Sequence, residues 1–489
     1  MKNKVTRRTF LSTTATAFAG LTVIPNHTMG SVLGHIAPSD KLNVAAVGIG
    51  SMGNATITAV KPTENIVALC DVDWSYAKHV FDANPNAKRY RDWRRMFDEM
   101  AGAIDAVIVA TADHSHAIVA ASAMTLGKHV YVEKPLTHSI YEARLLTRLA
   151  AKHQVATQMG NQGSSGEGLR LACDWVWNGE IGEVKRVDAW THHPIWPQGF
   201  NTPKQGMWTP DTLDWDLFTG PARLIPYHEL YHPIGWRGWW IYGTGALGDM
   251  ACHLMHPAFK ALHLSAPTKV QGYSTSLHAD SAPVAEMVHY SIPSRNIPSN
   301  KKLKFPNVDV YWYDGGMRPV LPEGWPADKR LGVGGAILHG TKDTLICDSN
   351  PWLLSGRTPV APKTQREVTA SHGMDWVRAC KESPENRIKT ASDFSAAGPF
   401  TEIVLLGVLS VRLQGLGKVL EWDHDNMQFT NISDNDQTTF IVEDKFGTDN
   451  SGRPNIYIPD KSEPVNAKAF AMEQIKHTYR EGWTLPAMP

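Results

Sequence analysis

Between residues 41 and 158, short apolar runs alternate with segments of helical periodicity. Buried strands are predicted for the runs at 42–47, 65–70, 104–110, 127–132 and 155–159. Ser139 and Glu142 have the spacing of a capping box, which predicts that a helix begins between the last two of these strands. Such alternation of strands and helices is typical of a parallel sheet with right-handed crossovers.

After Gly163 the pattern becomes that of an antiparallel sheet, with runs at 183–190, 269–277, 284–292 and 308–313. Within 308–313, Val, Val and Trp alternate with Asp, Tyr and Tyr, which predicts a strand with one buried face. The runs 335–338 and 344–347, joined by a tight polar turn, extend the same sheet. The segment 191–243 is dense in Pro, Gly and Trp and is too long for a simple connection, so we expect it to line a site.

The segment 48–53, GIGSMG, directly follows the first predicted strand and precedes a helix-compatible stretch. In this context Gly48 allows a tight turn, Gly50 lets the backbone approach a pyrophosphate, and Gly53 lets the helix pack closely on its strand. The helix N-terminus offers N–H groups and a partial positive charge to phosphates. We therefore predict that a dinucleotide is bound by Gly48, Gly50, Ser51, Met52 and Gly53.

Asp71 follows the second predicted strand, about 20 residues after the glycines, where an acidic residue meets the adenosine ribose. A carboxylate there accepts from the ribose hydroxyls and repels a 2′-phosphate. Because no Arg stands beside Asp71 in the sequence, NAD is favoured over NADP as the cofactor. The alternative interpretation is a glycine turn and a surface Asp in some other α/β protein.

Together these patterns predict an α/β fold, with an N-terminal Rossmann dinucleotide-binding domain and a C-terminal α/β domain that has a large, mostly antiparallel open sheet. A chain of 489 residues is long enough for two to three domains. We expect a leader at 1–37, the NAD-binding Rossmann domain at 38–163, a substrate-binding domain at 164–430 and a C-terminal extension at 431–489.

Charge and cysteine content narrow the classes of partner. The 48 basic and 48 acidic residues cancel, so we expect no nucleic acid and no anionic membrane surface as partner. A small or neutral molecule is favoured instead. The five cysteines show no CxxC and no metal-ligand spacing, which indicates buried thiols, although an exported protein can pair some of them.

The N-terminus carries Arg7 and Arg8 in a twin-arginine pattern, followed by a short, mild apolar stretch at 11–24. This combination predicts export by the twin-arginine pathway, to the periplasm or beyond. No clear A-x-A cleavage site follows, so a retained anchor or a flexible arm stays open, as does a disordered basic leader that carries no address. We expect no later segment to reach the length of a transmembrane helix.

Three further motifs add to the glycine loop. Glu133-Lys134-Pro135 follows the fourth predicted strand, Gly160-Asn161-Gln162 follows the fifth, and the glycine-rich segment 243–253 places Asp249 and His253 four residues apart. As a set, these motifs resemble the glucose-fructose oxidoreductase and inositol dehydrogenase family, Gfo/Idh/MocA. The resemblance covers the chain from Lys41 to about Thr430.

The resemblance implies roles for individual residues. In the family, a His at the position of His253 is the proton acceptor, a Lys at the position of Lys134 hydrogen-bonds the reacting oxygen, and an Asp at the position of Asp249 orients the substrate. Further cofactor-binding candidates are Thr111, Asp113, His116, Glu133, Lys134, Asn161 and Gln162. Simpler interpretations remain open: a solvated strand-end lysine, a capped helix start with a core histidine, and His116 as a packing residue.

This chain departs from the family where a second Asp commonly follows the Asp-x-x-x-His helix, because His256 and then Pro257 stand there. We expect Pro257 to kink the helix at the carbonyl of His253. Candidate substrate-binding residues are Trp190, His192, Arg237, Trp239 and His256, with the tryptophans as stacking faces for a sugar ring or, equally well, as core. Several histidines gather nearby, but none has HExxH or HxxxH spacing on a continuous predicted helix, so we expect no metal and keep zinc as the less favoured alternative.

These expectations combine into one function. We expect an exported, NAD-dependent oxidoreductase that acts on a secondary alcohol of a carbohydrate or polyol and holds its cofactor tightly, because free NAD is scarce outside the cytoplasm. The alternative is a glycoside hydrolase that oxidises, eliminates, hydrates and re-reduces its substrate with the same NAD. A sugar-binding protein with a vestigial site is a third class. The resemblance also implies a homo-oligomer formed through the open sheet.

Overall fold

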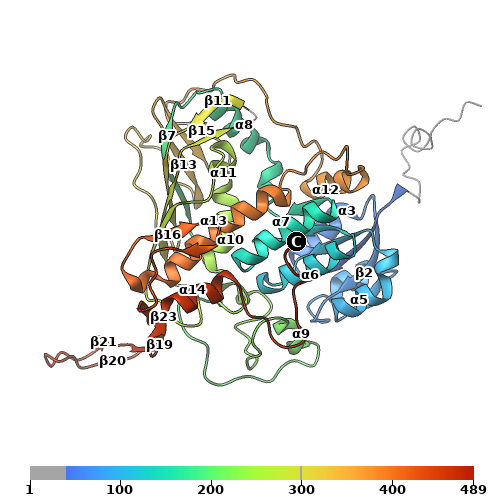
Figure 1. The fold of residues 1–489 in the computed structure, drawn as a ribbon, viewed down its shortest axis with the longest axis horizontal. Helices are drawn as coiled ribbons and strands as arrows, with labels where there is room; N and C mark the ends of the chain where they lie inside the picture. The colour runs from blue at the N-terminus through green and yellow to red at the C-terminus, as the bar shows by residue number, and fades with distance from the viewer. Residues whose placement is uncertain (1–39, 298–299) are drawn as a thin grey trace, which may run out of the picture. The chain divides into compact units, whose positions relative to one another are not determined.

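The computed structural model describes residues 40–297 and 300–489 (Figure 1). Leu42–Pro489 form one compact unit. The predicted leader at 1–37, with its twin-arginine motif, lies outside the described residues. Two sheets dominate the compact unit, a parallel sheet of six strands and a mixed sheet of nine.

The six-stranded sheet has the order β3-β2-β1-β4-β5-β6, and all of its pairings are parallel. Its strands are β1 (Asn43–Val47), β2 (Asn65–Cys70), β3 (Lys88–Tyr90), β4 (Ala106–Val109), β5 (His129–Val132) and β6 (Thr157–Met159). This order and the helices between the strands define a Rossmann domain, as predicted. The sequence pattern missed β3, because it has three residues and only Tyr90 of them is buried.

The helices of this domain are α3 (Met52–Val60), α4 (Lys78–Ala83), α5 (Trp93–Met100), α6 (Asp113–Thr125) and α7 (Ile140–His153). The Ser139 side chain accepts from the Glu142 N–H, and the Glu142 carboxylate accepts from the Ser139 N–H. The predicted capping box is therefore confirmed, and it fixes the start of α7.

The nine-stranded sheet has the order β15-β14-β13-β7-β12-β9-β8-β16-β17. Its strands are β7 (Val184–Thr191), β8 (Lys269–Ser274), β9 (Glu286–Ile292), β12 (Val308–Tyr313), β13 (Gly334–Gly340), β14 (Thr344–Cys347), β15 (Trp352–Leu353), β16 (Leu420–Asp423) and β17 (Gln428–Phe429). Only β7 and β12 pair in parallel. Alternate residues of β12 are buried and the β13–β14 hairpin extends the sheet, so both of these predictions are confirmed.

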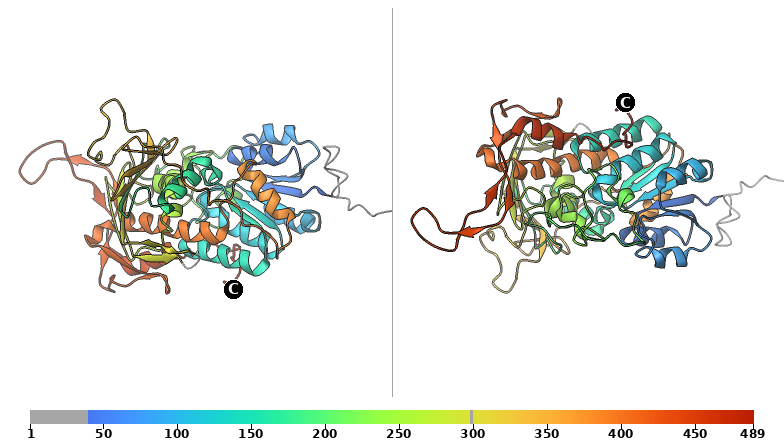
Figure 2. Two further views of the ribbon diagram at one scale, coloured as in Figure 1. Left: turned by 90° about the horizontal axis from the view of Figure 1, so that it is seen from above. Right: turned by 90° about the horizontal axis from the view of Figure 1, so that it is seen from below.

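One face of this sheet is covered by helices, as Figure 2 shows. They are α8 (Glu167–Trp177), α10 (Gly245–Leu254), α11 (His256–Ala261) and α13 (Phe394–Arg412). The long helix α13 packs on β8 and α10 and also on α7 of the Rossmann domain, so it joins the two sheets into one core. Strands β10 (Arg295–Ile297) and β11 (Asn300–Phe305) pair with each other and form a separate two-stranded sheet.

Helix α13 corrects the expectation about membrane-spanning length. Within the described residues it is the one helix long and apolar enough to cross a membrane, but 83% of its most apolar window is buried inside the protein. That burial is what a core helix shows. Pro399 lies inside this helix without ending it.

Segments far along the chain return to the Rossmann domain. Helix α12 (His372–Lys381) places Trp376 and Val377 in the core beside α3. Beyond α14 (Ala467–Ile475), the Tyr479 hydroxyl donates to the Glu142 carboxylate over 2.7 Å, and the ring of Trp483 lies under the guanidinium of Arg94. The tail therefore packs on the Rossmann helices.

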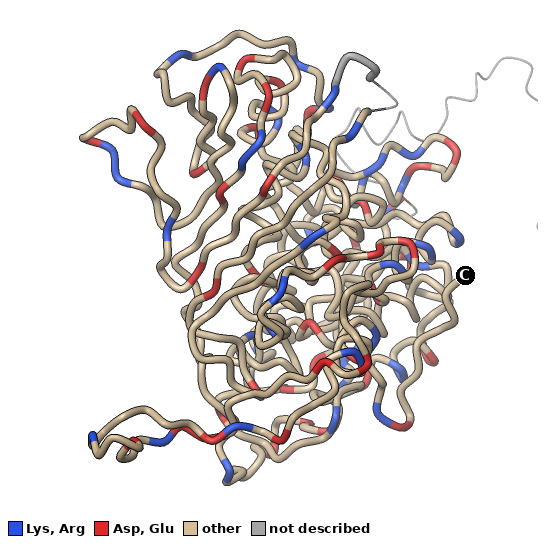
Figure 3. The backbone as a smooth tube through the Cα atoms, turned by 60° about the vertical axis from the view of Figure 1, so that its left-hand side comes forward, with Lys and Arg blue, Asp and Glu red and all other residues tan. Residues whose placement is uncertain are grey.

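Before that return, residues 437–466 form small two-stranded pairs: β18 (Gln437–Thr438) with β23 (Val465–Asn466), β19 (Ile441–Glu443) with β22 (Asp460–Lys461), and β20 (Phe446–Gly447) with β21 (Ile456–Tyr457). The β20–β21 ribbon projects from the compact unit in both Figure 1 and Figure 2. Basic and acidic residues are interspersed over the described chain, as Figure 3 shows.

Candidate active site

The glycine loop lies at the carboxyl edge of the Rossmann sheet and fits a dinucleotide. Gly48 has φ +77°, and a Cβ there would lie 2.5 Å from the Ala110 carbonyl oxygen. A Cβ on Gly53 would lie 2.0 Å from the Gly48 carbonyl oxygen, which explains the close approach of α3 to β1. At Gly50 the Cβ position is filled by the ring of Tyr76, 2.2 Å away, so this glycine makes room for a side chain of the cleft.

Asp71 holds the glycine loop in place. Its carboxylate accepts from the Ile49 N–H over 2.8 Å and from the Asp73 N–H over 3.0 Å. Burial raises the pKa of Asp71, although these two hydrogen bonds act in the opposite direction. The carboxylate lines the cleft beside the glycines, where the ribose of a dinucleotide is expected.

Arg91 corrects the expectation that no arginine lies near Asp71. It follows β3 and lines the same cleft, donates to the Thr212 carbonyl over 3.1 Å, and places its guanidinium 4.9 Å from the Trp74 ring. Arg91 was not predicted at the cleft because β3, the strand that precedes it and pairs with β2, was not predicted. The local signal, a Tyr-Arg pair ending a short run, was too weak to find it.

The dinucleotide cleft has one wall from the Rossmann domain and one from the long loop. The first wall includes Gly48, Gly50, Ser51, Met52, Asp71, Thr111, Glu133 and Lys134. The second includes Phe218, His232, Ile234, Trp236 and Arg237. We call residues 212–237 the strap. Residues of the strap line the cleft, as we expected for the segment 191–243.

Three hydrogen bonds tie the strap to the segment after β2. The Trp74 N–H donates to the Thr212 carbonyl over 3.2 Å, and the Asp214 N–H donates to the Val72 carbonyl over 2.9 Å. Nε2 of His232 lies 2.9 Å from a carboxylate oxygen of Asp73. The strap therefore spans the cleft and is fixed at the end where Asp71 lies.

At the other end, Asp249 lies between two cations. Its Oδ1 is 2.5 Å from Nζ of Lys134 and 2.9 Å from Nε of Arg237. Burial alone would raise the pKa of Asp249, but Lys134 and Arg237 hold it well below its usual range. All three groups are mostly buried, and Arg237 also lies over the Trp236 ring. Arg237, 12 residues from Asp249, completes a charged triad that Lys134 and Asp249 begin.

His253 lies one helical turn after Asp249 on α10, so the two share a face. Burial, with a further contribution from Lys134, lowers the pKa of His253 to about 4, so the ring is neutral at pH 7. Among the described residues no hydrogen-bond partner holds either ring nitrogen. His253 lines a smaller adjoining cavity of about 220 Å³ together with Asn161, Ser164 and Asp348, not the dinucleotide cleft itself.

The helix break that Pro257 predicts is present. Helix α10 ends at Leu254, and α11 begins at His256 with Pro257 in its first turn. The Lys134–Pro135 peptide bond is cis. His253 therefore lies in the last turn of a short helix, and it stays on the same helical face as Asp249.

Two buried carboxyl groups flank the triad. Burial raises the pKa of Glu133 to about 7, and its Oε2 has no hydrogen-bond partner among the described residues. Burial also raises the pKa of Asp113 to about 7, and its carboxylate accepts from the Thr244 hydroxyl over 2.9 Å. Gly160 leaves room for Glu133, because a Cβ there would lie 2.5 Å from its carboxylate.

Several cofactor-binding predictions need correction. Asp113 does not line the cleft, because its carboxylate is used to fix Thr244 at the start of α10. His116 does not line it either, since its ring nitrogens bond the Pro135 and Thr111 carbonyls over 2.8 and 3.0 Å. Asn161 lies in the adjoining cavity and donates to the Cys252 carbonyl. Gln162 lies behind Glu133, to which it donates over 3.4 Å.

Four of the five substrate-binding predictions also change. Trp190 is fully buried and packs on Ile337 and Ile346. It lies on the other face of the sheet from Val187 and Ala189. Trp239 is fully buried and donates to the Leu230 carbonyl within the aromatic core of the long loop. His256 is buried and packs on Phe400, and it borders only the adjoining cavity. His192 is exposed and contacts the Val333 carbonyl. Burial lowers the pKa of its neighbour His193, on which the charges of Asp249 and Lys134 also act.

Only Arg237 among these five lines the dinucleotide cleft. The period of two in β7 is the signal that places Trp190 on the opposite face from Val187 and Ala189. Within residues 40–297 and 300–489, no group of three or more His, Cys, Asp and Glu side chains is arranged to hold a metal ion. All five cysteines are buried and unpaired.

The parallel sheet with its glycine loop, and the charged triad at the cleft end, define an NAD-binding oxidoreductase. Residues 42–161 match the model of an oxidoreductase family with an NAD-binding Rossmann fold, and residues 183–292 match the C-terminal alpha/beta domain of the same family. The chain belongs to the Gfo/Idh/MocA oxidoreductase family. The predicted family, fold class and NAD cofactor are thereby confirmed.

The curated relatives are similar to less than half of this chain and at low sequence identity. The chain is 27% identical over 230 residues to glycosyl hydrolase family 109 protein 1 of Shewanella sp. (strain MR-4), covering 42% of this chain and 50% of the relative. A glycosyl hydrolase family 109 protein of Shewanella pealeana is 25% identical over 232 residues, with the same coverage. The chain spans about half the length of these relatives.

Solved structures share the fold. The WlbA dehydrogenase from Bordetella pertussis, in complex with NADH and UDP-GlcNAcA, has a TM-score of 0.53 and 16% identity, covering 78% of this chain and 99% of that one. An inositol dehydrogenase homolog from Azotobacter vinelandii, complexed with NADH and myo-inositol, has a TM-score of 0.52 and 16% identity, covering 78% and 98%. At this identity the similarity shows the fold alone.

Proposed function

We propose that the protein oxidises or reduces a secondary alcohol of a sugar, glycoside or polyol, with tightly held NAD. The observation that carries the proposal is the placement of Asp249 between Lys134 and Arg237 at the end of the dinucleotide cleft, with a neutral His253 one turn away. This group supplies a hydrogen-bond donor and a proton acceptor beside the position where a dinucleotide is expected.

Each residue has a defined task in this proposal. Bound NAD supplies the hydride chemistry. Lys134 donates a hydrogen bond to the reacting oxygen and stabilises the charge that develops on it. His253 accepts the hydroxyl proton in oxidation and returns it in reduction, a transfer that contributes about 10² to 10⁴ in rate. Asp249 orients Lys134 and Arg237, and Arg237 binds a substrate hydroxyl.

The strap supports tight retention of the cofactor. It spans the cleft and is fixed through Trp74, Asp214 and the His232–Asp73 contact, so release of a dinucleotide requires these contacts to open. Retention suits the exported or periplasmic location that we propose from the twin-arginine motif, where free NAD is scarce. A carbohydrate substrate and a homo-oligomeric state belong to the same proposal.

A second candidate function is an NAD-dependent glycoside hydrolase that works by transient oxidation, elimination and re-reduction. Two observations favour it: the matched curated relatives are glycosyl hydrolase family 109 proteins, and Glu133 offers an unpartnered carboxyl group whose burial raises its pKa to about 7. Such a group exchanges a proton readily at neutral pH, as elimination and hydration require.

One experiment separates the two candidates. The protein is purified without added cofactor, its bound nucleotide is released and identified, and the loaded protein is incubated with sugars, polyols and aryl glycosides. NADH that accumulates with one substrate and is re-oxidised by a second, carbonyl sugar supports the oxidoreductase. Release of an aglycone while bound NAD is unchanged at steady state supports the hydrolase. Turnover that is unaffected by removing the nucleotide contradicts both.

A further inference from the structure

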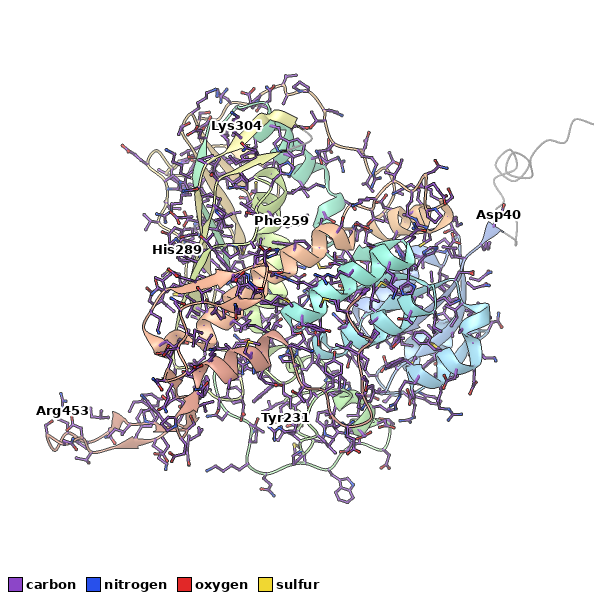
Figure 4. The ribbon with its side chains drawn as sticks, in the orientation of Figure 1. Asp40, Tyr231, Phe259, His289, Lys304 and Arg453 are labelled. Carbon is purple, nitrogen blue, oxygen red and sulfur yellow. The ribbon has the colours of Figure 1, made fainter. Side chains whose placement is uncertain are left out.

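A second large cavity lies between the long loop, the end of α13 and the C-terminal tail. We call it the C-terminal cavity; it encloses about 570 Å³ and is lined by residues that include Lys204, Arg223, Tyr231, Trp240, Arg412 and His477. Tyr231 is labelled in Figure 4, in the loop region that carries α9 (Trp215–Thr219). This volume is within the usual range of ligand pockets.

The C-terminal cavity is separate from the dinucleotide cleft. The two share only His114, whose ring nitrogens bond the Phe218 and Tyr242 carbonyls over 3.0 and 3.3 Å. The aromatic core of Trp215, Phe218, Tyr231 and Tyr242 stands between them. A ligand of this cavity therefore does not occupy the cofactor position.

Arg412 lies at the inner end of the cavity, in the last turn of α13. Its guanidinium is 4.8 Å from the ring centres of both Trp240 and Phe470, and its Nη1 donates to the Gln474 side chain. Nε is buried without a partner, and Nη2 has no acceptor among the described residues. No carboxylate in the described part of the chain lies within ion-pair distance of it, and burial lowers the pKa of Arg412 to about 9.

A buried guanidinium without a counter-anion is costly, because desolvation is not offset by an opposite charge. The two rings cover the flat faces of Arg412, and the end of α13 adds a favourable dipole. Neither supplies an acceptor for Nε, which has no partner among the described residues. An oxyanion fits the N–H edge of Arg412, since a guanidinium presents parallel N–H donors to a carboxylate or phosphate.

The neighbours of Arg412 fit the same ligand. The rings of His138 and His477 lie 4.6 Å apart, and His477 has no hydrogen-bond partner among residues that the structure describes. Burial, and to a lesser extent the positive charge of Arg412, lowers the pKa of His477 to about 3, so the neutral ring offers one N–H. The acids of the cavity are engaged, because Asp280 accepts from the Thr202 N–H and Glu473 accepts from Thr478.

We propose that the C-terminal cavity binds a small organic anion, a carboxylate or phosphate carried on a ring of monosaccharide size. The oxyanion pairs with the free N–H edge of Arg412 and with His477, and the ring lies against Trp240 and Tyr231. Arg223 and Lys204 at the entrance attract the negative charge. Arg412, Gln474 and His477 lie outside the residue ranges matched by the family models, whereas Tyr231 and Trp240 lie inside the second of them.

The test is calorimetric titration of the NAD-loaded protein with D-glucuronate, D-glucose 6-phosphate, inorganic phosphate and, as a neutral control, D-glucose. We expect one of the two anionic sugars to bind at least tenfold more tightly than glucose and inorganic phosphate. Glucuronate as the tighter ligand assigns a carboxylate, and glucose 6-phosphate assigns a phosphate ester. Equal binding of glucose, or equal binding of inorganic phosphate, overturns the proposal.

Variants assign the binding to this cavity. Arg412→Met keeps the apolar stem and is expected to weaken binding at least tenfold, whereas Lys204→Met at the entrance changes it less than threefold. His477→Phe fills the cavity with an apolar ring and is expected to abolish binding, which covers the case in which Arg412→Met does not fold. Lys134→Met leaves the binding unchanged; its loss in Lys134→Met would place the ligand at the active site and overturn the proposal.

Discussion

At the scale of single residues, the site depends on how burial and charge set protonation. Asp249 stays ionised because Lys134 and Arg237 contact the same carboxylate oxygen. His253 stays neutral because it is buried beside Lys134. Burial instead raises the pKa of Glu133, the residue before Lys134, to about 7, so this carboxyl group titrates near neutral pH. The dinucleotide cleft and the cavity that adjoins it thus bring together a fixed anion, a neutral base and a carboxyl group that titrates.

His253→Ala tests the proposed proton acceptor. We expect turnover to fall by about 10² to 10⁴, because a positioned base is lost, while the content of bound NAD stays the same. The measurements are single-turnover rates and the nucleotide released on denaturation. His289→Ala, which removes a histidine paired with Asp309 on the large sheet, is the control and is expected to retain full turnover. Loss of NAD with unchanged turnover per bound cofactor would contradict the assignment.

Glu133→Gln tests the titrating carboxyl group. The folded-state pKa of about 7 lies above the ordinary Glu value of 4.5, so the folded protein binds more protons and loses stability as pH rises from about 4.5 to about 7. The neutral Gln removes this loss, worth up to about 3 kcal/mol. We expect the thermal midpoint of the variant to rise relative to that of the natural protein between pH 5 and pH 7.5. Glu421→Gln, at an exposed site, is expected to show no such trend, and a parallel pH profile for Glu133→Gln would refute the shift.

At the scale of elements, the strap and α10 bring the two halves of the site together. Helix α10 presents Asp249 and His253 from the second domain to Lys134 at the end of β5. The strap supplies Arg237 from the other side and covers the cleft. Its aromatic residues pack into a core of their own, which makes a long loop rigid enough to position a side chain.

His232→Ala tests the strap as the element that retains NAD. The change removes the 2.9 Å contact with Asp73 that fixes the strap over the cleft. We expect NAD to dissociate at least about fivefold faster, measured by competition with an excess of labelled NAD, because affinity changes of this kind act mainly on dissociation. His228→Ala, on the same strap but away from the cleft, serves as control and is expected to leave the dissociation rate unchanged.

At the scale of the whole molecule, the core is assembled from distant parts of the chain. Helix α13 packs on both sheets, α12 covers the Rossmann domain, and the tail returns through Tyr479 and Trp483 to α7 and α5. The two sheets are thus tied together by elements that follow both of them in sequence. We expect them to unfold in one cooperative transition.

Truncation after Lys476 tests this arrangement. It removes the buried Trp483, the bond from Tyr479 to Glu142 and the Arg480–Asp216 ion pair, and the loss of a buried Trp alone costs about 3–5 kcal/mol. We expect the thermal midpoint to fall by several degrees. Replacing the projecting residues 446–457 by a two-glycine turn removes a similar length of chain and is expected to change the midpoint little. Equal effects of the two deletions would show that the tail does not hold the core together.

Several features that depend on local spacing were predicted from the sequence alone. The glycines of the loop, Asp71 after its strand, the capping box of α7 and the alternation in β12 are each set by neighbouring residues, so their patterns predict them directly. The same holds for Lys134 at the end of a strand, and for the pairing of Asp249 with His253 on one helical face. Periodicity states which face of an element is buried, and that was enough to predict the fold class and the cofactor.

Tertiary structure alone decided which residues meet. Arg237 joins Asp249 and Lys134 only because the strap folds back over the cleft, and Arg91 lines the same cleft as Asp71 only because β3 pairs with β2. Trp190 and Trp239 are large and central in the sequence, but packing turns both into the core. Arg412 contacts Gln474, which lies 62 positions further along the chain. Contacts of this kind are set by packing between elements, which a local pattern does not contain.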